Sequence, residues 1–207
     1  MHCACGPLED AIIFIMTQSA KAILRAELRR ARQSLSPEYR QQAADSLSKR
    51  ISQMDLFRRA THIAAYAGTP EEINPSEIIK TAFHLGKKLF LPVLPLDGSP
   101  RLEFAALTRE MHLIPNRFGI LEPQNRNITI KPSELDLVLL PLLGFDVQGN
   151  RLGMGKGYYD YTFECAKPGH PFLLGLAFEC QKRDAIPVDE KDVKLAAVAT
   201  EQNLYLV

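Results

Sequence analysis

The sequence predicts a three-layer α/β/α fold in which a mostly parallel or mixed sheet lies between helices. Strand-like apolar runs alternate with helix-like segments along the 207 residues, an order that places helices on both faces of a sheet. The run LDLVLLP, residues 135–141, is almost wholly apolar, as in a parallel strand covered on both faces. The composition, 46% hydrophobic and 24% charged, suits a globular domain that buries such a sheet. We therefore expect a Rossmann-like architecture.

The first two elements are expected to be helices. Residues 19–35, SAKAILRAELRRARQSL, begin with Ser19 in an N-cap position and carry apolar residues at helical spacing. The second helix begins at Ser36 as the cap, with Pro37 in the first helical position. The residues that the two helices direct inward are Leu24, Leu28, Ala31, Leu35, Ala44, Leu47, Ile51 and Met54.

Strands then alternate with shorter helices. One helix is expected to begin around Asn74 to Glu77 and to end at Gly86, and another to cover YYDYTFECA, residues 158–166. Besides residues 135–141, the expected strands are HIAAYA (62–67), KLFLPV (88–93), LEFAAL (102–107), FLLGLAF (172–178) and VATEQNLYLV (198–207).

Residues 1–18 are not expected to belong to the domain. The apolar run AIIFIM, residues 11–16, is far too short to span a bilayer, and the acidic Glu9 and Asp10 precede it where a signal peptide would be basic. Helix-like periodicity begins just after Met16, which we take as the natural start. We expect residues 1–18 to be a disordered or extraneous extension and residues 19–207 to form a single domain.

Charge and cysteine content restrict the function. The net charge of +1 argues against a general grip on nucleic acid, which needs a basic surplus. Cys3, Cys5, Cys165 and Cys180 have neither zinc-ligand spacing nor the pattern of a secreted disulfide framework. We expect free thiols, a reducing cytoplasm, no membrane span and no nucleic-acid partner.

A glycine-rich loop follows the apolar strand, where ligands bind in sheets of this kind. Gly153, Gly155 and Gly157 alternate with Met154 and Lys156, so several backbone N–H groups can converge on one anion. The spacing matches neither the P-loop nor the G-x-G-x-x-G dinucleotide pattern. The glycines alone leave phosphate binding and a structural turn equally open.

Charged residues beside the glycines favour binding. Arg151 and Lys156 add positive charge to the loop. Asp160 follows it and could hold a magnesium ion against phosphate oxygens, because magnesium prefers a few carboxylates together with phosphate and water. This combination indicates nucleoside triphosphate chemistry. Asp146, earlier in the segment, is interpreted as a residue that orders the loop.

The segment LLPLLGFDVQGNRLGMGKGYYD, residues 139–160, resembles the signature of the 5-formyltetrahydrofolate cyclo-ligase family. The resemblance extends over residues 19–205 and includes the K-x-x-L-R pattern at residues 21–25, FGILEP at residues 118–123 and D-V-K-L to V-A-T-E at residues 192–201. It implies an enzyme that uses ATP and Mg²⁺ to convert 5-formyltetrahydrofolate to 5,10-methenyltetrahydrofolate, releasing ADP and phosphate.

The resemblance also implies roles for residues. It assigns catalysis to Lys156, Arg151 and Tyr158, and the metal to Asp160 and Asp192. It assigns ATP binding to Lys21, Arg25, Arg151, Leu152, Gly153, Met154, Gly155, Lys156, Gly157, Tyr158 and Tyr159. It assigns the folate to Arg25, Glu72, Met154, Gly155, Lys156, Gly157 and Tyr158.

Other interpretations of these residues stay open. Glu71 could take the role of Glu72 if the register is shifted by one, and either Tyr158 or Tyr159 could face the folate. Lys21 and Arg25 could form a solvated basic face. Asp160 could instead be a helix cap and Asp192 part of a surface turn. Because the chain has no tryptophan, Phe118 is the candidate for an aromatic clamp.

Two other classes of function also stay open. One is a different ATP-dependent ligase or kinase built on the same loop, and the other is a non-catalytic regulator that binds nucleotide or folate without turnover. The expected partners are small molecules, and the expected state is a monomer or weak homodimer.

Overall fold

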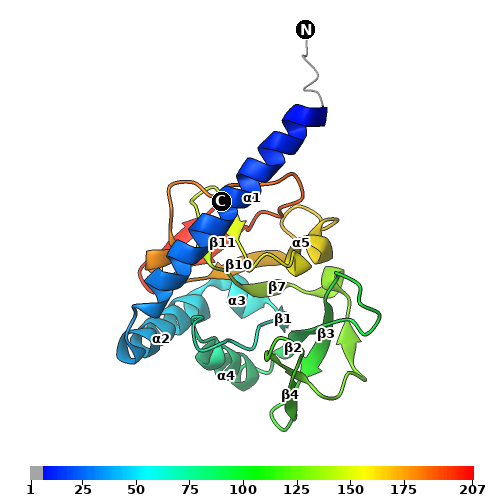
Figure 1. Ribbon diagram of the computed structural model, residues 1–207. Helices are drawn as coiled ribbons and strands as arrows, with labels where there is room; N and C mark the ends of the chain where they lie inside the picture. Colours follow the sequence, from blue (N-terminus) through cyan, green and yellow to red (C-terminus); the bar gives the residue numbers. More distant parts are fainter. Residues whose placement is uncertain (1–6) are drawn as a thin grey trace.

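The structure is a computed structural model that describes residues 7–207, with side chains from residue 15. One eight-stranded sheet, in the order β12-β11-β10-β7-β1-β2-β3-β6, forms its centre (Figure 1). Its strands are β1 (His62–Ala64), β2 (Lys88–Val93), β3 (Glu103–Leu107), β6 (Thr129–Ile130), β7 (Leu137–Pro141), β10 (Phe172–Leu176), β11 (Ala197–Ala199) and β12 (Leu204–Leu206). The five strands from β11 to β2 pair in parallel. At the ends of the sheet, β12 is antiparallel to β11, β3 is antiparallel to β2, and β6 is antiparallel to β3. The mixed α/β sheet is confirmed.

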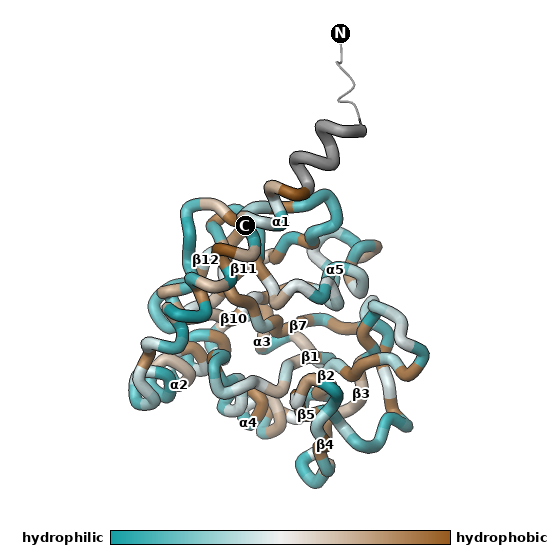
Figure 2. Tube along the Cα trace, in the orientation of Figure 1, coloured by the Kyte–Doolittle hydropathy of each residue, from teal (hydrophilic) through white to brown (hydrophobic). Residues whose placement is uncertain are grey.

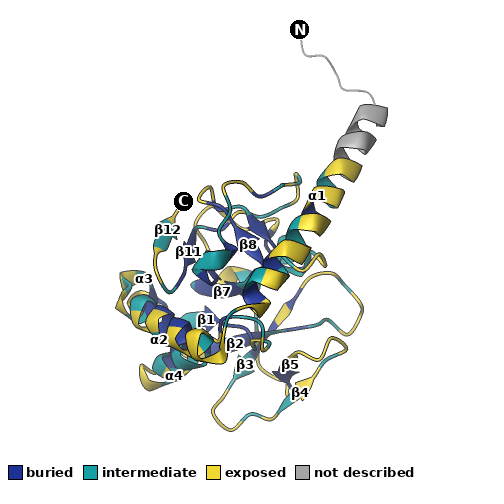
Figure 3. Ribbon diagram, turned by 60° about the vertical axis from the view of Figure 1, so that its left-hand side comes forward, coloured by how far each residue is buried: buried dark blue, intermediate teal, exposed yellow. Residues whose placement is uncertain are grey.

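Strand β7 is buried on both faces, as its apolar sequence predicts. Leu137 and Leu139 belong to one core cluster, and Val138 and Leu140 belong to the other. Side chains alternate between the faces of a strand, so an almost wholly apolar strand supplies both cores. Figure 2 shows the hydrophobic central strands, and Figure 3 shows them buried inside more exposed helices.

Helices cover the two faces unequally. The first core cluster includes residues from α2 (Pro37–Gln53), α3 (Asp55–Arg59) and α4 (Ser76–His84), which cover one face. On the other face, among the described residues, the short α5 (Tyr158–Phe163) supplies Phe163 to the buried core and packs Tyr158 and Tyr159 against it, and connecting segments complete the layer. The three-layer arrangement is present, with a thinner third layer than the sequence predicts.

Helix α1 (Pro7–Gln33) begins earlier than its predicted N-cap. Ser19 lies inside the helix, because residues 7–18 are also helical. The predicted cap of α2 is confirmed, since the N–H of Tyr39 donates to Ser36 Oγ at 3.2 Å. Residues 1–6 lie outside the described part of the chain, and the boundary of the natural protein stays a prediction.

Several elements differ from prediction. The expected strand at residues 198–207 is two antiparallel strands, because the backbone turns where Thr200 N–H donates to Asn203 O at 2.8 Å. The strand expected at residues 62–67 ends at Ala64, and the helix expected at residues 158–166 ends at Phe163. Elements not predicted are α3, the short strand β6, the hairpins β4 (Leu113–Pro115)–β5 (Leu121–Pro123) and β8 (Gly144–Phe145)–β9 (Arg151–Leu152), and the 3₁₀ helices η1 (Pro132–Glu134) and η2 (Glu179–Gln181).

Two remaining expectations concern cysteine and membranes. Cys165 and Cys180 are free thiols, as predicted, while Cys3 and Cys5 lie outside the described residues. Within residues 7–207, none of the helices combines the length and the apolar character needed to cross a membrane.

Candidate active site

The glycine loop joins β9 to α5 at the carboxyl edge of the sheet. Gly155 has φ +91° and Gly157 has φ +70°, a backbone region that other residues rarely adopt. A Cβ on Gly155 would also lie 3.3 Å from Cζ of Arg25. Gly153 has open space beside it instead. The loop therefore needs glycine at residues 155 and 157 for its conformation, and at 155 for the approach of Arg25.

Helix α1 brings its basic face to this loop. Arg25 Nε donates to Gly153 O at 2.9 Å, and Arg29 Nη2 lies 3.8 Å from the sulfur of Met154. Leu28 of α1 packs in a small core cluster with Leu152 of β9, and this contact holds the helix against the hairpin. Burial lowers the pKa of Arg25, and neighbouring Arg29 lowers it further. Leu152, an expected ATP contact, is thus a core side chain.

Lys21, one turn earlier on α1, is buried in an ion-pair network. Its Nζ lies 2.7 Å from Asp189 Oδ2 and 2.5 Å from Asp192 Oδ2. The lysine side chain is only 5% exposed, so a solvated basic face is wrong for this residue. Lys21 and Arg25 share one face of α1, but they contact different segments in this structure. A phosphate contact for Lys21 stays a prediction.

Arg151 and Asp160, which were expected to bind ligands, bind each other. Arg151 Nη2 lies 2.7 Å from Asp160 Oδ1, and its Nη1 donates to Val193 O. The same carboxylate oxygen accepts the N–H of Val193 at 3.0 Å. Arg151 is buried. These contacts tie β9 and α5 to the segment around residue 193, a structural role that the sequence did not indicate.

The two expected metal ligands, Asp160 and Asp192, lie on segments that are joined by the hydrogen bond from Val193 N–H to Asp160. Each carboxylate retains one oxygen without a partner among the described residues. Asp192 Oδ2 accepts from Lys21 and from the N–H of Asp189 at 2.8 Å. Oδ2 of Asp160 and Oδ1 of Asp192 have no hydrogen-bond partner among the described residues. Within that part of the chain, no three acidic, histidine or cysteine side chains form a complete metal site. Two partly available carboxylates fit a magnesium ion whose other ligands are phosphate and water.

The acidic loop after β1 distinguishes Glu71 from Glu72. Glu71 is committed to α1, because its two oxygens accept from Arg32 Nη2 at 3.1 Å and from Gln33 Nε2 at 2.8 Å. Glu72 accepts only the N–H of Thr69, at 2.9 Å, among the described residues. This arrangement favours Glu72 as the residue that meets a ligand.

The acidic loop leaves the sheet at the same end as the segment that carries the glycine loop, because β1 and β7 pair in parallel. Burial is the main cause that raises the pKa of Tyr159, and the negative charge of Glu72 is the second. The same two causes, in the same order, raise the pKa of buried Tyr66. The negative charge of Glu72 thus acts on Tyr66, which follows β1, and on Tyr159, at the start of α5.

The two tyrosines after the loop have different surroundings. Tyr159 stacks on Phe163, with ring centroids 6.5 Å apart and an interplanar angle of 12°. Tyr158 meets the β4–β5 hairpin instead, where Arg117 Nη2 donates to its hydroxyl at 2.7 Å. Phe118 contacts the Tyr158 ring edge-on at 6.4 Å. Tyr158 is thus the tyrosine that contacts the β4–β5 hairpin, and Tyr159 is the one that packs within α5.

Lys156 is the residue of the glycine loop whose positive charge is available to a ligand. Its side chain is exposed, and its Nζ lies 6.0 Å from the ring centroid of Phe118. No ion pair engages it among the described residues. Phe118 and Met154 are about half exposed. A free positive charge, an exposed aromatic ring and a thioether therefore surround the glycine loop.

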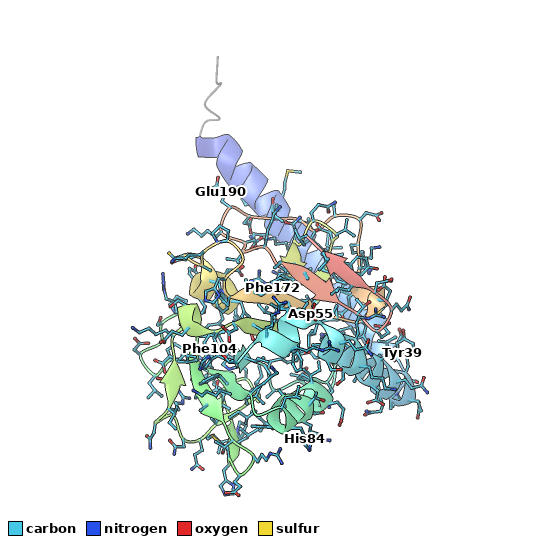
Figure 4. The ribbon with its side chains drawn as sticks, turned by 180° about the vertical axis from the view of Figure 1, so that it is seen from behind. Tyr39, Asp55, His84, Phe104, Phe172 and Glu190 are labelled. Atoms are coloured by element: carbon cyan, nitrogen blue, oxygen red, sulfur yellow. The ribbon has the colours of Figure 1, made fainter. Side chains whose placement is uncertain are left out.

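Two cavities lie beside the sheet. One, of about 550 Å³, lies between residues 163–173 and residues 190–196, and Asp192 and Val193 are among its lining residues. The other, of about 470 Å³, lies at the amino edge, where Asp55 and Phe172 line it (Figure 4). Only the first adjoins the residues assembled above.

The sequence did not indicate three residues of this arrangement: Asp189, Arg32 and Arg117. Each acts through a partner far away in the chain, so no local spacing could reveal it. The fold and the site together define an α/β protein with a glycine loop, an exposed cation and an exposed aromatic ring at the carboxyl edge of a largely parallel sheet, where ligands bind in folds of this kind.

Comparison with known proteins identifies the family. The model of the 5-formyltetrahydrofolate cyclo-ligase family matches residues 17–201, so the chain belongs to this family. A 5-formyltetrahydrofolate cyclo-ligase from Mus musculus is 34% identical over 198 residues, covering 91% of this chain and 97% of the mouse protein. One from Haemophilus influenzae is 32% identical over 181 residues, covering 87% and 97%.

Solved structures agree with the fold. The NMR structure of 5,10-methenyltetrahydrofolate synthetase from Aquifex aeolicus has a TM-score of 0.78 and 25% identity, covering 90% of this chain and 92% of its own. A 5,10-methenyltetrahydrofolate synthetase from Mycoplasma pneumoniae has a TM-score of 0.70 at 22% identity, covering 87% and 98%. The second likeness speaks for the fold alone.

Proposed function

We propose that the protein catalyses the ATP- and Mg²⁺-dependent cyclisation of 5-formyltetrahydrofolate to 5,10-methenyltetrahydrofolate, with release of ADP and phosphate. The family match over residues 17–201 carries this proposal. The exposed Lys156, the converging glycine loop and the nearby Phe118 support it, because they suit a phosphoryl group beside a flat aromatic ligand.

The chemistry needs an activated formyl oxygen. The γ-phosphoryl group moves from ATP to this oxygen, which leaves ADP and an O-phosphorylated iminium ion at N5. The lone pair of N10 then attacks the formyl carbon and forms the new C–N bond, and N10 releases its proton to solvent. The C–O bond breaks as phosphate leaves, which gives the methenyl cation. The protein's part in such a reaction is positioning and charge stabilisation.

The residues of the site divide this task. Backbone N–H groups of residues 153–157 and the side chain of Lys156 bind the phosphates, and Arg25 holds the loop in shape through Gly153 O. Tyr158 and Phe118 flank the folate, and Glu72 approaches from the acidic loop. Asp160 and Asp192 would hold Mg²⁺, which neutralises phosphate charge when bound.

Replacing Asp160 by asparagine should raise the Mg²⁺ concentration needed for half-maximal activity by about tenfold, because a carboxylate beside the phosphates is lost. A magnesium titration at saturating ATP measures this. Asp160→Asn also alters the contact with Arg151, so a melting curve must accompany it. The exposed Asp184→Asn is the matched control, and a titration unchanged from wild type would remove Asp160 from the metal site.

The proposal as a whole is tested by mixing the protein with 5-formyltetrahydrofolate, ATP and Mg²⁺ and following the near-ultraviolet absorbance of the product. A rise that requires all three components is expected. ADP released only with another acceptor would indicate a different kinase or ligase. A melting temperature that ATP and Mg²⁺ raise, without phosphate release when folate is added, would indicate a non-catalytic binder.

The same proposal covers partners and location. The ligands are ATP and a reduced folate, both small molecules, and neither nucleic acid nor membrane is needed. A cytoplasmic location and a monomer or weak homodimer are part of the proposal. Size-exclusion chromatography with light scattering tests the oligomeric state.

A further inference from the structure

One arginine of α2 joins three parts of the fold near the acidic loop. Arg40 Nε donates to Leu35 O at 3.1 Å, and its Nη2 donates to Arg32 O. Its Nη1 donates to Pro70 O at 3.2 Å and to Glu71 O at 3.0 Å. A single planar guanidinium therefore binds one carbonyl in the last turn of α1, one carbonyl just after that helix, and the backbone carbonyls of the acidic loop.

A second arginine holds the same loop by its side chain. Arg32 is only 2% exposed, and its Nη2 forms the ion pair with Glu71 Oε2 at 3.1 Å. The other oxygen of Glu71 accepts from Gln33. A buried charge without its partner is strongly unfavourable, so this pair restricts where Glu71 can lie. Glu71 is thus fixed by its backbone through Arg40 and by its carboxylate through Arg32.

Glu72, the residue that follows Glu71, is restrained as well. Glu72 N–H donates to Thr69 O at 3.0 Å, and Glu72 Oε2 accepts Thr69 N–H at 2.9 Å, which closes a tight turn. With Pro70 and Glu71 held from α1 and α2, the carboxylate of Glu72 keeps one direction. Because β1 and β7 pair in parallel, the acidic loop after β1 leaves the sheet at the same end as the segment after β7 that carries the glycine loop.

We propose that Arg32, Arg40 and Glu71 form a positioning clamp that aims Glu72 at the folate. The three residues do not touch the substrate and act through the backbone of residues 70–72. This inference rests on the proposed function, since a folate contact by Glu72 is part of it. Helix α1 also holds the glycine loop through Arg25, so the clamp fixes the acidic loop against the element that carries the phosphate side of the site.

The test compares Arg40→Ala, Arg40→Lys and Glu71→Gln with the control Arg50→Ala. Arg50 lies on the same helix and donates to Gln202 O at 2.8 Å, so it holds a different loop. In the clamp variants, KM for 5-formyltetrahydrofolate should rise by about tenfold or more, while KM for ATP stays within about twofold. Lysine should not rescue Arg40, because one ammonium lacks the planar fork that binds several carbonyls at once.

Amide hydrogen exchange provides a readout that does not depend on activity. The N–H groups of Thr69 and Glu72 should exchange faster in the clamp variants, while the glycine loop and the Arg50→Ala protein stay unchanged. Unchanged exchange at these two amides would overturn the clamp, and so would equal rises in both KM values. If the wild-type protein forms no methenyl product, the proposed function fails, and the exchange comparison still decides whether the clamp holds the loop.

Discussion

Replacing Lys156 by alanine is expected to lower kcat by about 100- to 1,000-fold, with little change in KM, because preorganised charge acts mainly on the transition state. Lys156 is the exposed cation of the glycine loop, and its Nζ forms no ion pair among the described residues. Its charge is therefore available when the phosphoryl group transfers. Steady-state kinetics with each substrate varied in turn measures the effect.

The matched control is Lys167→Ala, another exposed lysine, placed in the connection between α5 and β10. It should keep the wild-type kcat. Because Lys156 is exposed and packs only beside Phe118, the alanine variant should also keep the wild-type melting temperature. Full kcat with only a raised KM would refute the role of Lys156 in the chemical step.

Replacing Asp146 by alanine is expected to lower the free energy of unfolding by about 3 kcal/mol, because it leaves buried donors without acceptors. Asp146 is 1% exposed. Its Oδ1 accepts the N–H groups of Gln148 at 3.0 Å and Asn150 at 3.1 Å. Its Oδ2 accepts the N–H of Ile186 and the side chain of Asn150, both at 2.9 Å. Urea denaturation measures the change.

Asp97→Ala is the control for this loss. Asp97 is exposed, and among the described residues it accepts one hydrogen bond, from the N–H of Ser99 at 2.9 Å, so its removal should cost under about 1 kcal/mol. Asp146→Asn keeps the shape but replaces one acceptor oxygen with a donor, and it should fall between the two. An Asp146→Ala protein as stable as wild type would show that the turn closes without this carboxylate.

Periodicity predicted the central fold well because burial alone decides it. Strand β7 carries apolar residues for both faces of the sheet, and its almost wholly apolar sequence predicts this burial. The β4–β5 hairpin was missed because a buried carboxylate organises it. Glu122 accepts Leu94 N–H at 2.9 Å and Asn116 Nδ2 at 2.7 Å, and it pairs with Arg126 at 2.9 Å. A hairpin held by polar contacts of this kind has no apolar pattern from which it could be predicted.

The candidate site was predictable where it is local. The glycines and Lys156 lie within one short segment, so their spacing was visible in the sequence. The partners of Lys21 lie at the other end of the chain, at Asp189 and Asp192, and only the fold brings them together. Arg151 and Asp160 lie close together in the sequence, but the sequence does not show that these two opposite charges form an ion pair with each other.

The position of β7 has a consequence for how the protein is made. β7 pairs with β1 on one side and β10 on the other, and residues 65–136 separate it from β1. Parallel pairing across such sequence distances gives a high contact order and slow folding. A nascent chain cannot complete the sheet until β10 and β11 have emerged from the ribosome. Lys21, which is synthesised before β1, gains its carboxylate partners Asp189 and Asp192 only after β10 has been synthesised.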